Sequence, residues 1–152
     1  EERLDIVDNA VLIPVAVLVI IALYVVLKSP AKFTDVTVGN VTLNAEIADT
    51  WPKQVKGLMF RDSLPKNQGM LFIFSSDGYP GIWMANMSIP IDILWIDSKH
   101  KIVDVMENAE PCGIICPTYT PESASRYVLE VNAGFVKENK IRVGNKVQFK
   151  LS

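Results

Sequence analysis

Two cysteines close together offer the most specific chemistry in this sequence. Cys112 and Cys116 are the only cysteines among the 152 residues, and they enclose Gly-Ile-Ile. Two buried thiols, a metal site and a local disulfide are the alternatives. A structural zinc site needs four ligands, and the one histidine, His100, is distant in sequence. A disulfide is therefore favoured, which requires an oxidising compartment.

Catalytic groups are harder to find. A nucleophile with a histidine base has only His100 to use, and lysines flank it in an expected exposed turn. A carboxylate pair, Glu46 with Asp92 or with Glu107, stays open because sequence spacing says little about proximity in β folds. Glycine-rich phosphate loops do not occur. The sequence therefore predicts a protein that is not an enzyme, without a metal or another cofactor.

The charged residues indicate neither a nucleic-acid partner nor a strongly acidic protein. Fifteen Lys and Arg oppose seventeen Asp and Glu, and they are scattered along the chain. No basic patch is interleaved with aromatic residues, so we expect no nucleic acid as a partner. Two sequons, at Asn40 and Asn86, are candidate glycosylation sites and fit an exported chain.

A long apolar run precedes the rest of the sequence. Residues 11–27 carry no charge, and as a helix at about 1.5 Å per residue they nearly cross a hydrocarbon core. Lys28 and Lys32 follow the run and acidic residues precede it, which by the positive-inside rule places the domain in the cytoplasm. A cytoplasmic location conflicts with a disulfide, which requires an oxidising compartment. A basic leader that set the orientation in the membrane and was then cleaved before Glu1 would remove the conflict.

The remaining sequence predicts short strands with tight turns. We expect a hydrophobic helix over residues 1–29, a linker over 30–35 and a β-rich globular domain over 36–152. Alternating or β-branched-rich runs predict strands, and Thr50 with Pro52 predicts the start of a short helix that reaches Met59. The predicted strands are 33–38, 41–48, 70–74, 81–86, 91–96, 101–107, 126–131 and 146–151, with a second short helix over 133–139. The fold class is mainly β: a compact jelly-roll-like sandwich or partly open barrel with short helices, preceded by one long hydrophobic helix.

An ordered succession of motifs carries a family resemblance. The motifs are Glu46-Ile-Ala-Asp-Thr50, Gly57-Leu-Met-Phe-Arg61, Gly69-Met-Leu-Phe-Ile-Phe74, Trp83-Met-Ala-Asn86, Ile89-Pro-Ile-Asp-Ile93, Pro111-Cys112 and Tyr127-Val-Leu-Glu-Val-Asn-Ala-Gly134. Together they resemble the prokaryotic family known as domain of unknown function 192, over about residues 36–150. The resemblance implies a compact, mainly β domain, often exported, and no particular reaction.

Four residues that match the family motifs are candidates for a ligand pocket: Arg61, Trp83, Asn86 and Asp92. A cleft built from them would hold a small anionic or carbohydrate ligand, with Arg61 as a bidentate donor and Trp83 as a stacking surface. The competing interpretation is structural. In it, Arg61 pairs with Asp92, while Trp83 and Met84 fill the core.

The N-terminal helix carries the functional prediction. It resembles that of type IV pilins, which combine a cleaved leader, a long hydrophobic helix and a β-rich head. We therefore expect a structural subunit of an archaeal-type extracellular filament, located in the filament or at the cell surface. Before assembly the chain would be inserted in the membrane, and it would then polymerise with copies of itself. The expected assembly residues are Arg3, Asp5, Asp8, Pro14, Val17, Ile21 and Tyr24. The alternative is a membrane-anchored extracytoplasmic domain that binds a small ligand.

Overall fold

The computed structural model describes residues 13–21, 30–113 and 115–151. The chain divides into two compact units, Glu1–Ala31 and Lys32–Ser152. In the first unit, the described residues 13–21 are helical and exposed. The long hydrophobic helix predicted over residues 1–29 is not found within the described part, which holds only this short stretch of it. No described helix is both long enough and apolar enough to span a membrane.

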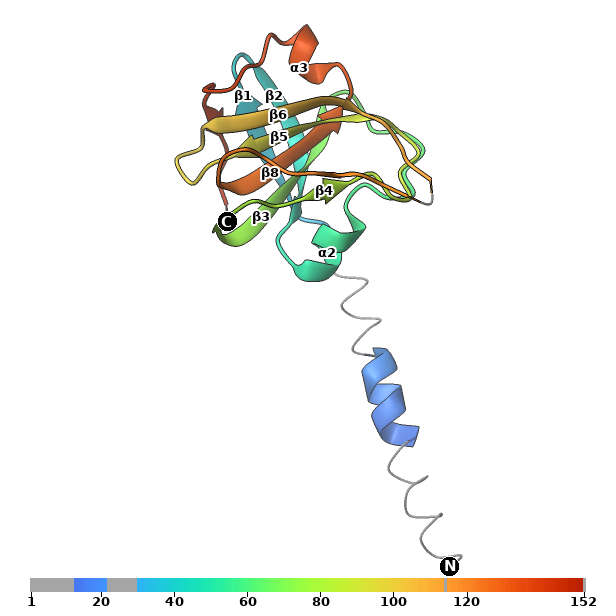
Figure 1. The fold of residues 1–152 in the computed structure, drawn as a ribbon. Coiled ribbons are helices and arrows are strands. Elements are labelled where there is room, and N and C mark those ends of the chain that lie inside the picture. Colours follow the sequence, from blue (N-terminus) through green and yellow to red (C-terminus); the bar gives the residue numbers. More distant parts are fainter. Residues whose placement is uncertain (1–12, 22–29, 114, 152) are drawn as a thin grey trace, which may run out of the picture. The chain divides into compact units, whose positions relative to one another are not determined.

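The second unit is mainly β, with two short helices, as the sequence predicts (Figure 1). Seven strands form its main sheet and two form a small separate ladder. The strands of the main sheet are β1 (Phe33–Val38), β2 (Val41–Ala48), β3 (Gln68–Gly78), β5 (Ile91–Ile96), β6 (Ile102–Ala109), β8 (Ser125–Asn132) and β9 (Val147–Gln148). The ladder pairs β4 (Ile82–Trp83) with β7 (Thr118–Tyr119), and the helices are α2 (Trp51–Lys56) and α3 (Phe135–Glu138).

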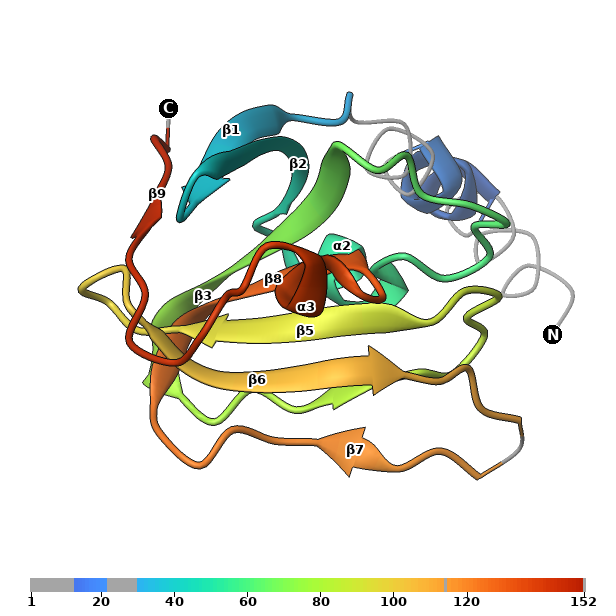
Figure 2. The same ribbon diagram turned by 90° about the horizontal axis from the view of Figure 1, so that it is seen from above.

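The main sheet has the order β6-β5-β8-β3-β2-β1-β9, and all its neighbours are antiparallel except β2 and β3. The sheet curls into a half-barrel (Figure 2). Its two edges approach each other, because Lys101, just before β6, bridges Lys146, just before β9. The Val147 amide also donates to the His100 carbonyl at 2.9 Å. These bonds close one corner of the curl.

Side chains from both edges of the sheet meet inside the curl and form what we call the inner core. Its members are apolar: Val36, Val38, Leu43, Ala45, Leu71, Leu94, Ile96, Ile102, Tyr127, Leu129, Val131, Phe135, Val136, Ile141 and Val147. The opposite face of the sheet carries the outer core, which α2, β4 and the loops around them cover. Its members are Ala48, Leu58, Leu64, Met70, Phe72, Ile82, Met84, Ile91, Ile93, Trp95, Ala109 and Val128.

Strand β8 lies in the middle of the sheet, between β5 and β3, and is buried on both faces. Successive side chains of a strand point to opposite faces. Accordingly Leu129 and Val131 enter the inner core, whereas Val128 enters the outer core. Glu130 shares the parity of Val128 and is paired with Met70 and Ile93, both outer-core residues. The sheet therefore directs the Glu130 carboxylate into the outer core.

Asp92 points to the opposite face, because its partner on β8 is the inner-core residue Val131. It is fully buried, and its two carboxylate oxygens accept from the backbone amides of Asn108 and Val136, each at 2.8 Å. One side chain thus attaches the end of β6 and helix α3 to the central sheet. Asp92 has a structural role and does not pair with Arg61, which overturns the expected Arg61–Asp92 ion pair.

Bounds predicted from the sequence agree with the structure where apolar alternation is regular. Strands β1, β2 and β5 have the predicted ends. The first helix ends at Lys56 instead of Met59, because Gly57 leaves the helical conformation with a φ of 47°. The predicted strands 81–86 and 146–151 shrink to two residues each, and β7 lies where no strand is predicted.

We predict that Asp92→Asn destabilises the protein by about 3 kcal/mol, because the new amide group turns a donor toward a buried backbone N–H. Asp77→Asn is the matched control, since Asp77 forms a solvent-exposed ion pair with Arg126 and should cost at most about 1 kcal/mol. Urea unfolding of both variants measures the difference. Equal losses would show that the Asp92 bonds do not anchor α3.

Candidate functional site

A small cavity of about 50 Å³ opens on the outer-core side of the sheet, and we call it the Glu130 pocket. Residues 54–59, from α2 and the loop after it, form one wall, and residues 81–83 together with Met87 form another. Phe72 of β3 and Glu130 of β8 complete the lining. The rigid central strands thus supply one side of the pocket, and the segments that cover the outer core supply the rest.

Glu130 is the unusual residue of this pocket. Only 4% of its surface is exposed. No hydrogen bond to its carboxyl group is found within the described residues, and Glu130 lies on the wall of the cavity. Burial raises the pKa of Glu130 from 4.5 to about 8, although the nearby Arg61 charge opposes the rise. Desolvation of the charged form is the cause, since a carboxylate loses far more hydration than a carboxylic acid. At neutral pH, Glu130 is therefore mainly a protonated carboxylic acid.

Arg61 lies beside the pocket and forms an ion pair with Glu46, with 2.5 Å between Nη2 and Oε2. Glu46 and Glu130 belong to one row across the sheet, with Met70 between them. Their backbones are therefore two strand spacings apart, roughly 10 Å. Arg61 is thus paired with Glu46, and its charge lowers the pKa of Glu130 by less than burial raises it.

The loop between α2 and β3 approaches the pocket in an unusual conformation. A Cβ on Gly57 would lie 3.3 Å from Phe72 Cζ and 3.9 Å from Glu130 Oε2, so only glycine fits this position with its positive φ. Phe60 has a φ of 62° and Asn86 a φ of 57°. The Phe60 amide donates to the Asn86 carbonyl at 2.9 Å. Left-handed backbone at an aromatic residue is strained, and such strain clusters at binding sites.

Aromatic surface is left uncovered around this loop. Trp83 lines the pocket and 52% of its surface is exposed, while Phe60 is 71% exposed. The interpretation in which Trp83 fills the core is therefore wrong, although its neighbour Met84 is fully buried. Because residues alternate on β4, Ile82 and Met84 anchor the segment in the outer core and Trp83 faces outward. Trp83 is thus a rigidly supported, accessible ring.

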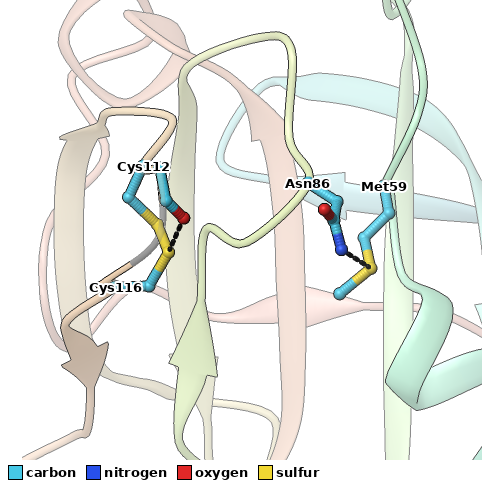
Figure 3. The surroundings of a disulfide bond; sticks show 5 residues. Met59, Asn86, Cys112 and Cys116 are labelled. Carbon is cyan, nitrogen blue, oxygen red and sulfur yellow. Dashed lines mark hydrogen bonds between the residues drawn. A yellow bond between two sulfur atoms is a disulfide. The ribbon is translucent and has the colours of Figure 1, made fainter.

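The four residues predicted to form a ligand pocket do not all meet. Trp83 lines the Glu130 pocket, Arg61 acts on its carboxyl group, and Asn86 is joined to the same loop through Phe60. Asp92 lies on the other face of the sheet, so it is not part of this site. Asn86 is exposed and donates only a weak 3.9 Å bond to the sulfur of Met59 (Figure 3).

The structure contains the disulfide between Cys112 and Cys116, with 5.4 Å between their Cα atoms (Figure 3). Both cysteines are half-buried, and Cys112 packs against the outer core. Both candidate glycosylation residues, Asn40 and Asn86, are exposed, which leaves their modification a prediction. Among the residues that the structure describes, no group of three His, Cys, Asp or Glu side chains is placed to hold a metal ion.

The sequence predicted that His100 lies in an exposed turn, but its side chain is not freely exposed. It is half-buried, and its ring stacks on Phe149 with 4.2 Å between centroids and meets the edge of Tyr127. Of the candidate carboxylates, Glu107 is exposed, Glu46 is paired with Arg61 and Asp92 is held by backbone amides. The carboxylate pairs considered from the sequence therefore do not form a catalytic site.

The predicted assembly residues fall in the first unit. Pro14, Val17 and Ile21 are helical and exposed. Arg3, Asp5, Asp8 and Tyr24 lie outside the described residues.

Sequence reasoning did not select Glu130, although a signal was present. The strand around it, Tyr127-Val-Leu-Glu-Val131, has apolar residues at both parities. Such a run predicts burial on both faces, and a carboxylate inside it must then lie in a low-dielectric environment. The alternation of the strand was sufficient to place this side chain in the interior, but not to show that no donor would reach it.

Comparison with known proteins supports the resemblance seen in the motifs. The model of the family DUF192, described as "Uncharacterized ACR", matches residues 34–149. A UPF0127 protein of Pyrococcus abyssi is 33% identical over 106 residues, which cover 68% of this chain and 84% of that protein. A UPF0127 protein of Thermococcus gammatolerans is 29% identical over 108 residues, which cover 70% of this chain. The matched part spans only 66% of the Thermococcus protein.

Two crystal structures share the fold. A Sinorhizobium meliloti protein, described as a candidate transcription regulator, superimposes with a TM-score of 0.72 at 29% identity. The match covers 80% of this chain and 97% of that protein. A Novosphingobium aromaticivorans protein of unknown function has a TM-score of 0.71 at 27% identity, and the match covers 80% and 94% of the two chains.

The filament prediction is wrong. The relatives that share the globular domain are UPF0127 proteins, and the structural neighbours described above are a candidate regulator and a protein of unknown function, so none of them is a pilin. The physical reason is that an apolar run shows which residues avoid water, but not what they pack against. The globular domain is what identifies the protein: with more than half of its length matched, the chain belongs to the DUF192 family.

Proposed function

We propose that the globular domain binds a small ligand that carries a ring and an uncharged hydrogen-bond acceptor, such as a carbonyl or hydroxyl oxygen. The acceptor enters the Glu130 pocket and the ring lies on Trp83 at its rim. The observation that carries this proposal is the Glu130 carboxyl group, buried and without a hydrogen-bond partner among the described residues, at the wall of an open cavity. Buried polar groups normally have partners, so a ligand is the natural one.

The size of the pocket limits what enters it. About 50 Å³ holds three to five water-sized probes at roughly 10–15 Å³ each. A whole ring does not fit, but a carbonyl or hydroxyl group does. The ring must then remain at the rim, where Trp83 is half exposed and held by Ile82 and Met84 in the outer core. Stacking on a supported aromatic ring costs little conformational entropy.

The protonation state of Glu130 selects the acceptor. Because the pKa of Glu130 is about 8, its carboxyl group donates a hydrogen bond at neutral pH. A neutral acceptor satisfies that donor without bringing charge into the outer core. A ligand carboxylate in the same place would have to lose its own hydration, which favours the neutral ligand. The domain is therefore suited to amides, ketones and sugars, and less to acids.

Two other functions have weaker support. Acid–base catalysis would use the contrast between Glu130 and Glu46, but Glu46 does not line the pocket and is already paired with Arg61. Nucleic-acid binding, which the description of the Sinorhizobium relative raises, lacks an electrostatic basis, since this chain has a net charge of −2.

Ligand binding is testable on the full chain with benzamide, which carries a ring and a carbonyl acceptor, and benzoate, which carries a carboxylate. At pH 6.5 we expect benzamide to bind at least about 10-fold more tightly than benzoate. Trp83→Ala should weaken benzamide binding at least about 10-fold, about 1.4 kcal/mol, because the stacking surface is lost. Chemical-shift titration of amides in residues 54–59 and 81–87 measures the affinity and locates the probe.

Trp51→Ala is the matched control for Trp83→Ala. Trp51 lies on α2, is 75% exposed and does not line the pocket, so its removal should leave benzamide binding unchanged. Equal losses in the two variants, benzoate binding as tightly as benzamide, or the absence of shifts in the lining residues would each contradict the proposal.

The pH dependence of stability tests the buried acid itself. Because the pKa of Glu130 is raised in the folded protein, the folded state holds more protons than the unfolded state between pH 4.5 and pH 8. The wild type should therefore lose stability relative to Glu130→Gln as pH rises through this window, by up to about 1.4 kcal/mol per pH unit. Urea unfolding of both proteins at pH 5, 6.5 and 8 measures the difference.

The same pair of proteins also links the proton to binding. Benzamide affinity should fall in the wild type as pH rises from 6.5 to 9, because the ionised carboxylate cannot donate. In Glu130→Gln the affinity should not change with pH, because the amide does not titrate. A difference in unfolding free energy between the two proteins that stays constant from pH 5 to pH 8 would show that Glu130 is ionised throughout.

A further inference from the structure

The segment that carries Trp83 is held by the chain that follows β6, at two places. In the small ladder, Ile82 pairs with Tyr119 and Trp83 with Thr118. A few residues further on, Ala85 forms a parallel bridge with Cys112, whose amide donates to the Met84 carbonyl at 3.4 Å. Both attachments lie next to Trp83 in sequence, so they fix the position of the pocket rim.

These attachments have little support from the main sheet. Strands β4 and β7 have two residues each and form a ladder of their own. Their contact is close, because a Cβ on Gly81 would lie 2.6 Å from Thr118 Cγ2. A short ladder with few backbone bonds opens more easily than the central strands. Ile82 and Met84 hold one side of the segment in the outer core, and the path of the chain after β6 determines how firmly the other side is held.

The Cys112–Cys116 disulfide (Figure 3) lies in the part of the chain that makes both attachments. Cys112 forms the bridge with Ala85, and Cys116 comes shortly before Thr118 of the ladder. The covalent bond therefore fixes the distance between the two points that hold Trp83. Both cysteines are half-buried, but among the described residues only Cys112 packs against the outer core, so the Cys116 sulfur is the one that an external thiolate attacks.

We propose that this disulfide is a redox switch of the Glu130 pocket, closed by oxidation and released by a dithiol, and that the switch acts through the β4–β7 ladder on Trp83. This inference rests on the proposed function. The oxidised chain keeps the rim in its binding position. The reduced chain frees the β7 side of the ladder, so Trp83 no longer provides a fixed surface and ring-bearing ligands dissociate faster.

The exchange balances with a dithiol as the reductant. A thiolate of the dithiol attacks the Cys116 sulfur, the bond between the two protein sulfurs breaks, and Cys112 leaves as a thiolate that takes up a proton. The second dithiol sulfur then attacks the mixed disulfide and releases Cys116 as a thiol. The protein gains two electrons and two protons, and the dithiol is oxidised to a cyclic disulfide.

Hydrogen exchange on the full chain, with and without dithiothreitol, tests the switch without a ligand. Reduction should speed amide exchange at least 10-fold at residues 82–87 and 118–119, and leave β5 and β8 unchanged. Cys112→Ser/Cys116→Ser is the matched control: its exchange at these residues should be fast with or without dithiothreitol. Unchanged exchange in reduced wild type would overturn the proposal, as would acceleration spread evenly over the sheet.

Benzamide titration gives the second measurement. Reduction should weaken binding to the wild type about 10-fold, and dithiothreitol should not change binding to the double variant. If the oxidised wild type binds neither benzamide nor benzoate, the proposed function fails, but the exchange result still decides whether the disulfide controls the ladder. If the oxidised wild type binds benzamide as expected but reduction changes neither amide exchange nor benzamide affinity, the proposed redox switch is wrong and the proposed function stands.

Discussion

Burial of β8 on both faces is the constraint on which the other features depend. A strand in the middle of a half-barrel, covered outside by α2 and β4, has no solvent-facing side. Because β8 has no solvent-facing side, apolar residues occupy both its odd and its even positions, and they pack into the inner core and the outer core. Glu130 is the exception within this strand, and its raised pKa follows from the same burial that stabilises its neighbours.

The two buried carboxyl groups of the sheet, those of Asp92 and Glu130, differ in their hydrogen bonds. The Asp92 oxygens accept from two backbone amides, so both oxygens have partners and the residue connects α3 and β6 to the sheet. Glu130 has no such donor among the described residues, and Arg61, whose charge lowers its pKa, is engaged by Glu46. The hydrogen bonds of Asp92 stabilise the fold. The Glu130 carboxyl group keeps its hydrogen-bonding capacity for the proposed ligand.

The alternation of apolar and polar residues predicted much of the fold. It predicted less of the candidate site. Residues 33–38 and 41–48 alternate regularly, so β1 and β2 were predicted with their observed ends. Strand β4 was predicted too long and β7 was missed, because two-residue strands have no period to detect. Asp92 and Arg61 were assigned to one site because motifs do not record which face of a sheet a side chain occupies. Strand parity, applied to β8, would have indicated Glu130.

The parallel pairing of β2 with β3 has a consequence for how this site changes in evolution. Parallel neighbours need a crossover connection, and here that connection is residues 49–67, which contain α2 and the Gly57–Arg61 loop. The wall of the pocket is therefore also the segment that closes the central strand pair during folding. Insertions that reshape ligand selectivity would lengthen a folding crossover. The same residues thus serve the folding of the sheet and the shape of the cavity, so neither can change without the other.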